Sequence, residues 1–228
     1  MIDDGKQRVM LTSFLRSVLK EQKDDPKIEE MVGEGLSKGI KYIQQMPRGD
    51  ARIKHLYKDM DKAVELQMEE RAKDKKELPI SCKRGCAHCC HLYVVCTHEE
   101  ADLIYKEAKK RNIPLSKKRL EYQSRFKNPG DYFTRFGKRT RCVFLDDKND
   151  CMIYEYRPMS CRKYFAISPP ETCLPDKDGK VQNVGSPVNI SVELLASAHM
   201  NMDLIEGMAK EGDNFSLSAR MLERVKRE

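Results

Sequence analysis

The chain of 228 residues lacks the long apolar segment that a membrane helix requires. No stretch approaches the roughly 20 apolar residues that cross a bilayer, so we expect no membrane partner. The first 22 residues carry charges throughout and show no small-residue cleavage site, which is not the pattern of a secretory signal. We therefore expect a cytoplasmic protein, in a compartment where thiols are kept reduced.

The sequence also lacks the short motifs of several common enzyme classes. It contains no G-x-x-x-x-G-K-S/T, no G-x-G-x-x-G, no G-x-S-x-G and no H-E-x-x-H. Nucleotide-dependent enzymes and hydrolases therefore have little support. At this point the sequence leaves open whether the protein is an enzyme at all.

What the chain does contain is cysteine, and its placement is uneven. All nine cysteines lie between Cys82 and Cys173. Without an export signal, such cysteines indicate metal ligands or reactive thiols sooner than disulfides. The formal net charge of +7 gathers in the same region, since residues 82–166 alone carry +9.

Apolar residues at helical spacing predict a mainly α-helical protein. Pro26 and Pro47 separate the first three predicted helices. Thr97 and Glu100 form a capping-box pattern that starts the fourth. The predicted helices cover residues 11–19, 28–43, 53–68 and 98–111, the stretch after Ser116, and residues 194–208 and 215–225.

The remaining segments predict irregular structure around the cysteines. Residues 128–141 and 166–190 are rich in glycine or proline and should be loops. A short apolar run at 143–145, followed by a turn-rich stretch, predicts at most a small β-hairpin. We thus expect a helical scaffold around an irregular, cysteine-rich metal core. We divide the chain into an N-terminal helical region (1–79), a cysteine-cluster metal-binding domain (80–166) and C-terminal loop and helices (167–228) packed on the same domain.

The cysteines form two groups that have the chemistry of a metal site. Thiolates are soft ligands that suit zinc, Cu(I) and iron–sulfur clusters. Adjacent cysteines rarely bind one metal together, so Cys89 and Cys90 should serve different centres or opposite sides of one cluster. The groups are a C-x3-C-x2-C-C run, Cys82, Cys86, Cys89 and Cys90, and a widely spaced set, Cys142, Cys151 and Cys161.

This pattern resembles the YkgJ-like cysteine-cluster family, also described as the CxxCxxCC zinc- or iron-chelating family. The residues that carry the resemblance are Ser81-Cys82-Lys83-Arg84-Gly85-Cys86-Ala87-His88-Cys89-Cys90, Cys142-Val143-Phe144-Leu145, Cys151-Met152-Ile153-Tyr154, Arg157-Pro158 and Cys161-Arg162. Val143 stands where the family usually has proline, and the first gap is three residues, a form that also occurs in the family.

The resemblance covers about residues 80–166 and implies a cysteine-bound metal or iron–sulfur cluster. It does not fix one activity. Flagellin lysine-N-methylases carry a similar cluster, so methylation remains a minor option. We predict the seven cysteines of the two groups as metal ligands: Cys82, Cys86, Cys89, Cys90, Cys142, Cys151 and Cys161.

The other cysteines and two histidines have weaker claims. Cys96 follows an apolar run, so we interpret it as a core residue. For Cys173 we favour an ordinary loop thiol over an auxiliary ligand. His88 and His91 flank the double cysteine, and we favour surface or outer positions for both over direct ligation.

Spacing favours an iron–sulfur cluster, with 4Fe–4S as the candidate type, over zinc. A 4Fe–4S cluster needs four cysteines, whereas two structural zinc sites need about eight ligands. The widely spaced group contains no second C-x2-C knuckle. We predict Arg157 and Arg162 as cofactor-binding cations beside a negatively charged cluster. For Arg157, an ion pair near Glu155 is an equally weighted alternative.

Two functions follow from these observations. The first is a metal or iron–sulfur protein with a redox or cluster-dependent role and a redox or protein partner. The alternative is a non-catalytic, zinc-stabilised module that binds a protein or nucleic-acid partner through a basic surface. Residues 104–141 carry a net charge of +10 with interleaved aromatic residues. No nucleic-acid-binding motif accompanies them, so nucleic acid is possible but not favoured.

Overall fold

A computed structural model describes residues 9–22, 25–74, 80–83, 85–129, 132, 137, 139–173, 189–210 and 212–227. Parts of the predicted loops at 128–141 and 166–190 lie outside these residues. The described chain is mostly helical and contains no sheet, which confirms the predicted fold class. Its β structure consists of two isolated antiparallel bridges, Val95–Ser216 and Leu145–Cys151. The second bridge is all that forms of the predicted hairpin.

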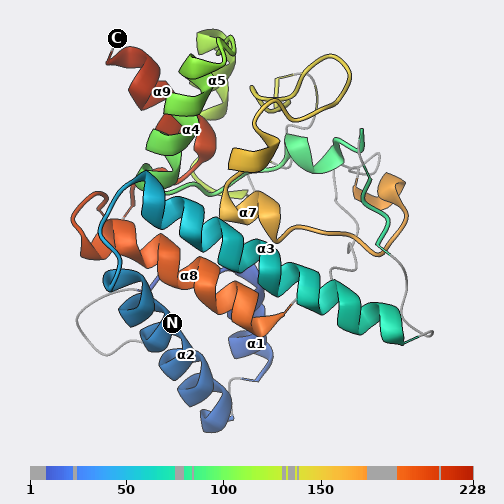
Figure 1. The fold of residues 1–228 in the computed structure, drawn as a ribbon, viewed down its shortest axis with the longest axis vertical. Helices are drawn as coiled ribbons and strands as arrows, with labels where there is room; N and C mark the ends of the chain where they lie inside the picture. The colour runs from blue at the N-terminus through green and yellow to red at the C-terminus, as the bar shows by residue number, and fades with distance from the viewer. Residues whose placement is uncertain are drawn as a thin grey trace.

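The helices follow the predicted order (Figure 1). None of those that the structure describes is long and apolar enough to cross a membrane. The elements are α1 (Ser13–Glu21), α2 (Pro26–Gln44), α3 (Asp50–Lys73), η1 (His88–His91), α4 (His98–Lys110), α5 (Lys117–Gln123), η2 (Tyr154–Tyr156), α7 (Met159–Arg162), η3 (Pro170–Cys173), α8 (Ile190–Ile205) and α9 (Leu217–Lys226).

Side-chain caps start α2 and α4 near the positions that the sequence predicts. The Asp25 side chain accepts a hydrogen bond from Lys27 N, and Pro26 occupies the first position of α2. At α4, the Thr97 side chain accepts from Glu100 N while the Glu100 side chain accepts from Thr97 N. The predicted capping box is therefore confirmed.

The first hydrophobic core joins the N-terminal helices to a helix near the end of the described chain. In Figure 1, α8 lies between α2 and α3, and it packs against α1, α2 and α3. Leu15, Leu36, Leu56 and Met202 are buried there among residues of all four helices. In space this core combines residues from all three predicted regions of the chain, whose boundaries remain a prediction.

Two glycines of α2 let α8 approach closely. Glycine inside a helix lowers the stability of that helix, so the sequence alone gives no reason for either residue. A Cβ atom on Gly39 would lie 2.9 Å from the Cβ of Ala198, and one on Gly35 would lie 2.5 Å from a terminal methyl of Leu194. Ala198 is rigid at Cβ and cannot move aside, so the contact at Gly39 requires the absence of a side chain.

We expect the substitution Gly39→Ala to destabilise the protein by about 1–3 kcal/mol, the usual cost of overpacking. At an exposed helix position the same change would stabilise it by up to about 1 kcal/mol. Thermal or urea unfolding followed by circular dichroism measures the difference. Ser37→Ala, on the exposed side of the same helix, is the control. A variant G39A as stable as S37A would contradict the close packing.

The second core lies under α4, α5 and α9 and reaches the cysteine segments. Phe144, Ile153 and Leu120 are buried there. The Val95–Ser216 bridge ties this core to α9, since Cys96 N donates to Phe215 O (2.8 Å). Cys96 has no exposed surface, as predicted for a core residue.

Helix α8 ends before its predicted boundary. The apolar pattern extends to Met208, but α8 stops at Ile205. Gly207 has a φ of +69°, which favours glycine. Its N–H donates to Leu204 O, and Met208 N donates to Asp203 O, the hydrogen-bond pair of a Schellman motif.

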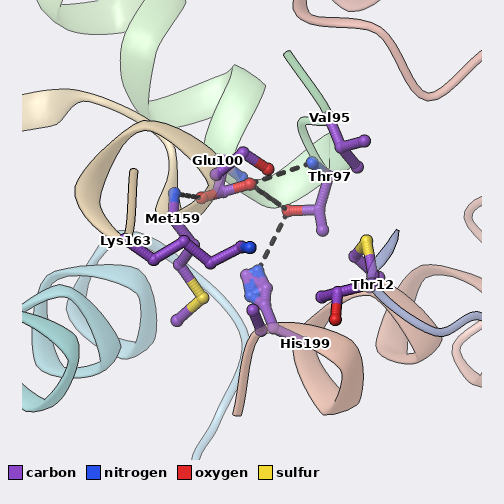
Figure 2. Close-up of a pocket in the computed structure, with 10 residues that line it drawn as sticks. Thr12, Val95, Thr97, Glu100, Met159, Lys163 and His199 are labelled. Atoms are coloured by element: carbon purple, nitrogen blue, oxygen red, sulfur yellow. Dashed lines mark hydrogen bonds between the residues drawn. The ribbon is translucent and has the colours of Figure 1, made fainter. Parts of the chain in front are cut away.

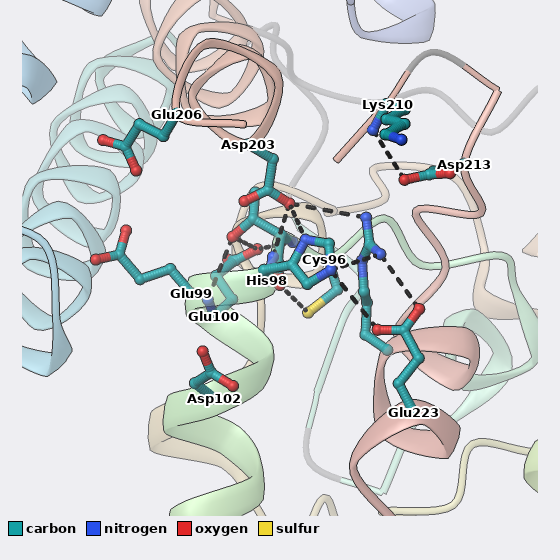
Figure 3. A network of polar contacts seen from close by, with 12 residues as sticks. Cys96, His98, Glu99, Glu100, Asp102, Asp203, Glu206, Lys210, Asp213 and Glu223 are labelled. Atoms are coloured by element: carbon teal, nitrogen blue, oxygen red, sulfur yellow. Dashed lines mark hydrogen bonds and ion pairs between the residues drawn. The ribbon is translucent and has the colours of Figure 1, made fainter. Parts of the chain in front are cut away.

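A buried ionic network joins α4, α8 and α9 (Figure 3). His98 is its centre: its backbone N–H donates to the Asp203 carboxylate (2.7 Å), and its Nδ1 lies 3.1 Å from the same group. Its Nε2 lies 3.0 Å from Arg220. Asp203 and Arg220 are 4% and 1% exposed, so neither charge is compensated by solvent.

Candidate metal centre

The C-x3-C-x2-C-C run forms a turn followed by a single 3-10 turn, η1. Gly85 has a φ of +82°, which permits the chain reversal between Cys82 and Cys86. The Cys82 sulfur accepts a hydrogen bond from Ala166 N (3.3 Å), and Ser81 N donates to Ala166 O (2.8 Å). The first cysteine is therefore anchored beside the segment that follows the last cysteine of the second group.

The second group is attached directly to the first. Cys142 N donates to Cys90 O at 2.7 Å. A tight turn follows, in which the Asp146 side chain accepts from Lys148 N and Asp150 N. This turn brings Cys151 back opposite Leu145. Cys161 comes next along the chain, inside the short helix α7.

The thiols of both groups are close enough to influence one another's charge. Burial raises the pKa of the Cys161 thiol well above its usual value, and Cys89, Cys142 and Cys151 raise it further. Burial, with smaller contributions from Cys151 and Cys89, raises the pKa of Cys142 to about 12. The structure thus brings Cys89 together with all three cysteines of the second group.

Cys89 also lies close to the other cysteines of the first group. Its hydrogen bond with Cys90 is the largest cause of its raised pKa, followed by burial. The raised pKa of Cys82 comes from burial first, with contributions from Cys89 and Cys86. The Cys89–Cys90 pair therefore lies between Cys82 and Cys86 on one side and the second group on the other.

Cys173 joins this assembly, although the sequence favours an ordinary loop thiol. It is 5% exposed and lies in η3, which packs against η1. Burial, followed by Cys82, Cys86 and Cys89, raises its pKa to about 11. No motif signals this proximity, because it depends on how the chain returns after α7.

The donor set fits a thiolate-bound metal in its chemistry. All nine cysteines are free thiols, and eight of them, all except Cys96, belong to this assembly. Within the residues that the structure describes, no three Cys, His, Asp or Glu side chains are arranged as a ready metal site. The thiols are therefore chemically suited to bind a soft metal, and their sulfur atoms would move closer together when the metal binds. The ligand roles of the seven predicted cysteines remain a prediction.

The two predicted arginines occupy different positions. The positive charge of Arg157 lowers the pKa of the Cys89, Cys151 and Cys161 thiols, against the larger effect of their surroundings. Its guanidinium therefore lies beside the cysteine assembly. Its guanidinium also stacks on the exposed Tyr154 ring at 3.8 Å. The alternative for Arg157 is an ion pair near Glu155, but Glu155 pairs with Arg111.

Arg162 is 4% exposed and holds the chain between Cys151 and Cys161. Its Nε donates to Arg157 O (2.9 Å), and its terminal nitrogens contact Glu155 O and the Asp61 carboxylate. It also stacks on Tyr57 at 4.0 Å. These contacts position the loop, whereas the predicted cofactor-binding role of Arg162 remains a prediction.

His91 contacts the loop that precedes Cys142. His91 Nδ1 lies 3.2 Å from Gly137 O and 3.4 Å from the Thr140 hydroxyl. Burial lowers its pKa. His91 is therefore engaged with the loop before Cys142, in line with the predicted outer position.

The cap of α4 contacts the start of α7 (Figure 2). Glu100, already part of the capping box, accepts a hydrogen bond from Met159 N at 2.7 Å. Lys163, just after α7, pairs with the buried Glu193 at 2.7 Å. Glu100 and Lys163 line a pocket with His199, which contacts the Thr97 hydroxyl at 3.0 Å. Rigid helices of both cores thus fix the position of Cys161.

Thiols gathered from separate segments, tied by backbone hydrogen bonds and flanked by the positive charge of Arg157, define a cysteine-cluster metal-binding domain. Residues 81–183 match the family model "CxxCxxCC: Putative zinc- or iron-chelating domain". The matched family is the one that the cysteine pattern resembles, so the resemblance is confirmed over this segment. The matched range extends past Cys173. Neither a search of curated proteins nor one of solved structures returned a match.

Proposed function

We propose that the protein holds an iron–sulfur cluster in its cysteine assembly and has a redox or cluster-dependent role. The observation that supports this proposal is the gathering of the predicted cysteines from three separate segments around Cys89. Cysteines that only pack in a core occur singly, and such packing does not explain a cluster of this many thiols. A bound iron–sulfur cluster would supply one-electron transfer or, at an iron without a protein ligand, a substrate-binding position.

Two features favour iron–sulfur over zinc. The second group supplies ligands from widely spaced positions and lacks the paired knuckle typical of structural zinc sites. Arg157 places a positive charge beside the thiols, which would stabilise the net negative charge of a four-thiolate cluster. In this proposal the chain's own residues bind the cluster, neutralise its charge and screen it from water.

The alternative is a zinc-stabilised module that binds a partner through its basic surface. Several cations of residues 104–141 already have protein partners. Lys106 pairs with Asp50, and Arg111 pairs with Glu155. Arg139 stacks on Tyr122 at 5.4 Å. These contacts support solvated or paired helix faces over a nucleic-acid site, so we keep partner binding as the second proposal.

The deciding experiment is anaerobic purification without added metal, with elemental analysis and a visible spectrum on the same sample. We expect brown protein with iron and acid-labile sulfide in comparable amounts. Colourless protein with stoichiometric zinc would support the alternative, and the basic surface would then be tested for partners. Metal-free protein that still unfolds cooperatively would contradict both.

A further inference from the structure

The eight clustered thiols divide into two sets around the Cys89–Cys90 pair. On one side, the segment of Cys82 and Cys86 is hydrogen-bonded to residues 166–168, since the Ser81 hydroxyl donates to both Ala166 O and Ser168 O. Residues 166–168 are followed closely by η3, which contains Cys173 and packs on η1. Cys173 thereby lies beside the Cys89–Cys90 pair, at the end of the segment that Ser81 holds next to Cys82.

On the other side are Cys142, Cys151 and Cys161. The Cys142 N–H is bonded to Cys90 O, and the chain returns through the Leu145–Cys151 bridge to α7. Each side therefore supplies three thiols, and the pair between them supplies two more. A tetrahedral zinc site and a 4Fe–4S cluster each use four thiolates.

We propose that the domain contains two four-thiolate centres, with Cys173 as a ligand of the first. Cys82, Cys86 and Cys173 would bind one centre, and Cys142, Cys151 and Cys161 the other. Cys89 and Cys90 contribute one thiolate to each. This deepens the proposed function and rests on it, because it concerns the number of centres and their ligands rather than whether metal is bound.

Two nearby donors, Cys96 and His91, are engaged elsewhere. Cys96 is sealed in the second core and lies 3.5 Å from the carbonyl of Thr97. His91 is engaged with Gly137 and Thr140. Cys173 is the donor that completes the first set, and the family match extends to residue 183 and so includes it.

Metal counting on the full-length chain tests the division. For two centres of one kind we expect about two zinc ions, or about eight irons with eight sulfides, per wild-type chain. Cys173→Ala and Cys161→Ala should each lose about half of the metal, and the double variant nearly all of it. Cys96→Ala, outside the assembly, should keep the wild-type content. Far-UV circular dichroism and elution volume establish that each variant is folded.

A labelling experiment keeps the test valid if a variant does not fold. Native wild-type protein is treated with iodoacetamide before and after chelation, and labelled cysteines are identified by mass spectrometry. We expect Cys173 to become labelled on chelation together with Cys82 and Cys86, while Cys96 stays protected. Full metal content in folded C173A, or labelling of Cys173 in the metal-loaded protein, would overturn the inference. Metal-free wild-type protein would instead contradict the proposed function itself.

Discussion

Replacing Asp203 by alanine is expected to lower the free energy of unfolding by about 3–5 kcal/mol, the cost of removing one partner from a buried charge pair. Asp203 accepts hydrogen bonds from the His98 backbone and side chain and lies 3.8 Å from Arg220. Without it, the buried Arg220 loses its nearest fully buried counter-charge. The first N–H of α4 would also lose its acceptor. Urea unfolding measured by circular dichroism gives the change.

Two further variants sharpen this test. Asp203→Asn keeps a hydrogen-bond acceptor and removes the charge, so its loss should be smaller than that of Asp203→Ala. Asp213 is exposed and accepts a hydrogen bond from Lys210 N at 2.8 Å. Asp213→Ala should remain within about 1 kcal/mol of the wild type. If D203A were as stable as D213A, the network in Figure 3 would not hold the helices together.

The second large effect is expected at Arg162. Arg162→Ala removes a buried guanidinium that binds two backbone carbonyls and the Asp61 carboxylate and stacks on Tyr57. We expect a loss of about 2–4 kcal/mol in unfolding free energy, because several charge-assisted bonds disappear at once. The loop that positions Cys161 would loosen, so metal should dissociate faster from this variant when a chelator is added.

Arg111 provides the matched control. Its guanidinium also contacts residues 152–156, through Glu155 and the Tyr156 ring, but its side chain is 38% exposed. Arg111→Ala should cost less than about 1 kcal/mol. Arg162→Lys should not restore stability, since lysine cannot reproduce the planar, forked set of donors. Equal metal retention in R162A and R111A would show that Arg162 does not position the site.

Local chemistry explains which elements the sequence predicts well. The capping box at Thr97 and Glu100 needs only residues three positions apart, and it forms as expected. The cysteine run is equally local, and its resemblance to a known family is confirmed over residues 81–183. The apolar pattern alone places the end of α8 too late, because Gly207 at positive φ ends the helix before Met208.

Features that depend on distant segments could not be predicted in this way. Gly39 weakens an isolated helix, and only the presence of Ala198 shows why a side chain is excluded there. Cys173 belongs to no motif, and its position follows from the packing of η3 on η1. Arg162 adjoins a predicted ligand in the sequence, yet its hydrogen bonds go to backbone carbonyls and to Asp61 of α3.

The contact of the segment before α1 with α8 also has a consequence for biosynthesis. Asn201 of α8 hydrogen-bonds both backbone groups of Met10, 191 positions earlier in the chain. Contacts of such long range form late and slow folding, because a long loop must close before they can be made. On the ribosome, α1 to α3 would wait with an open apolar face until α8 emerges. By then every cysteine has been synthesised, so the thiols meet the cellular metal pool before the first core can close around α8.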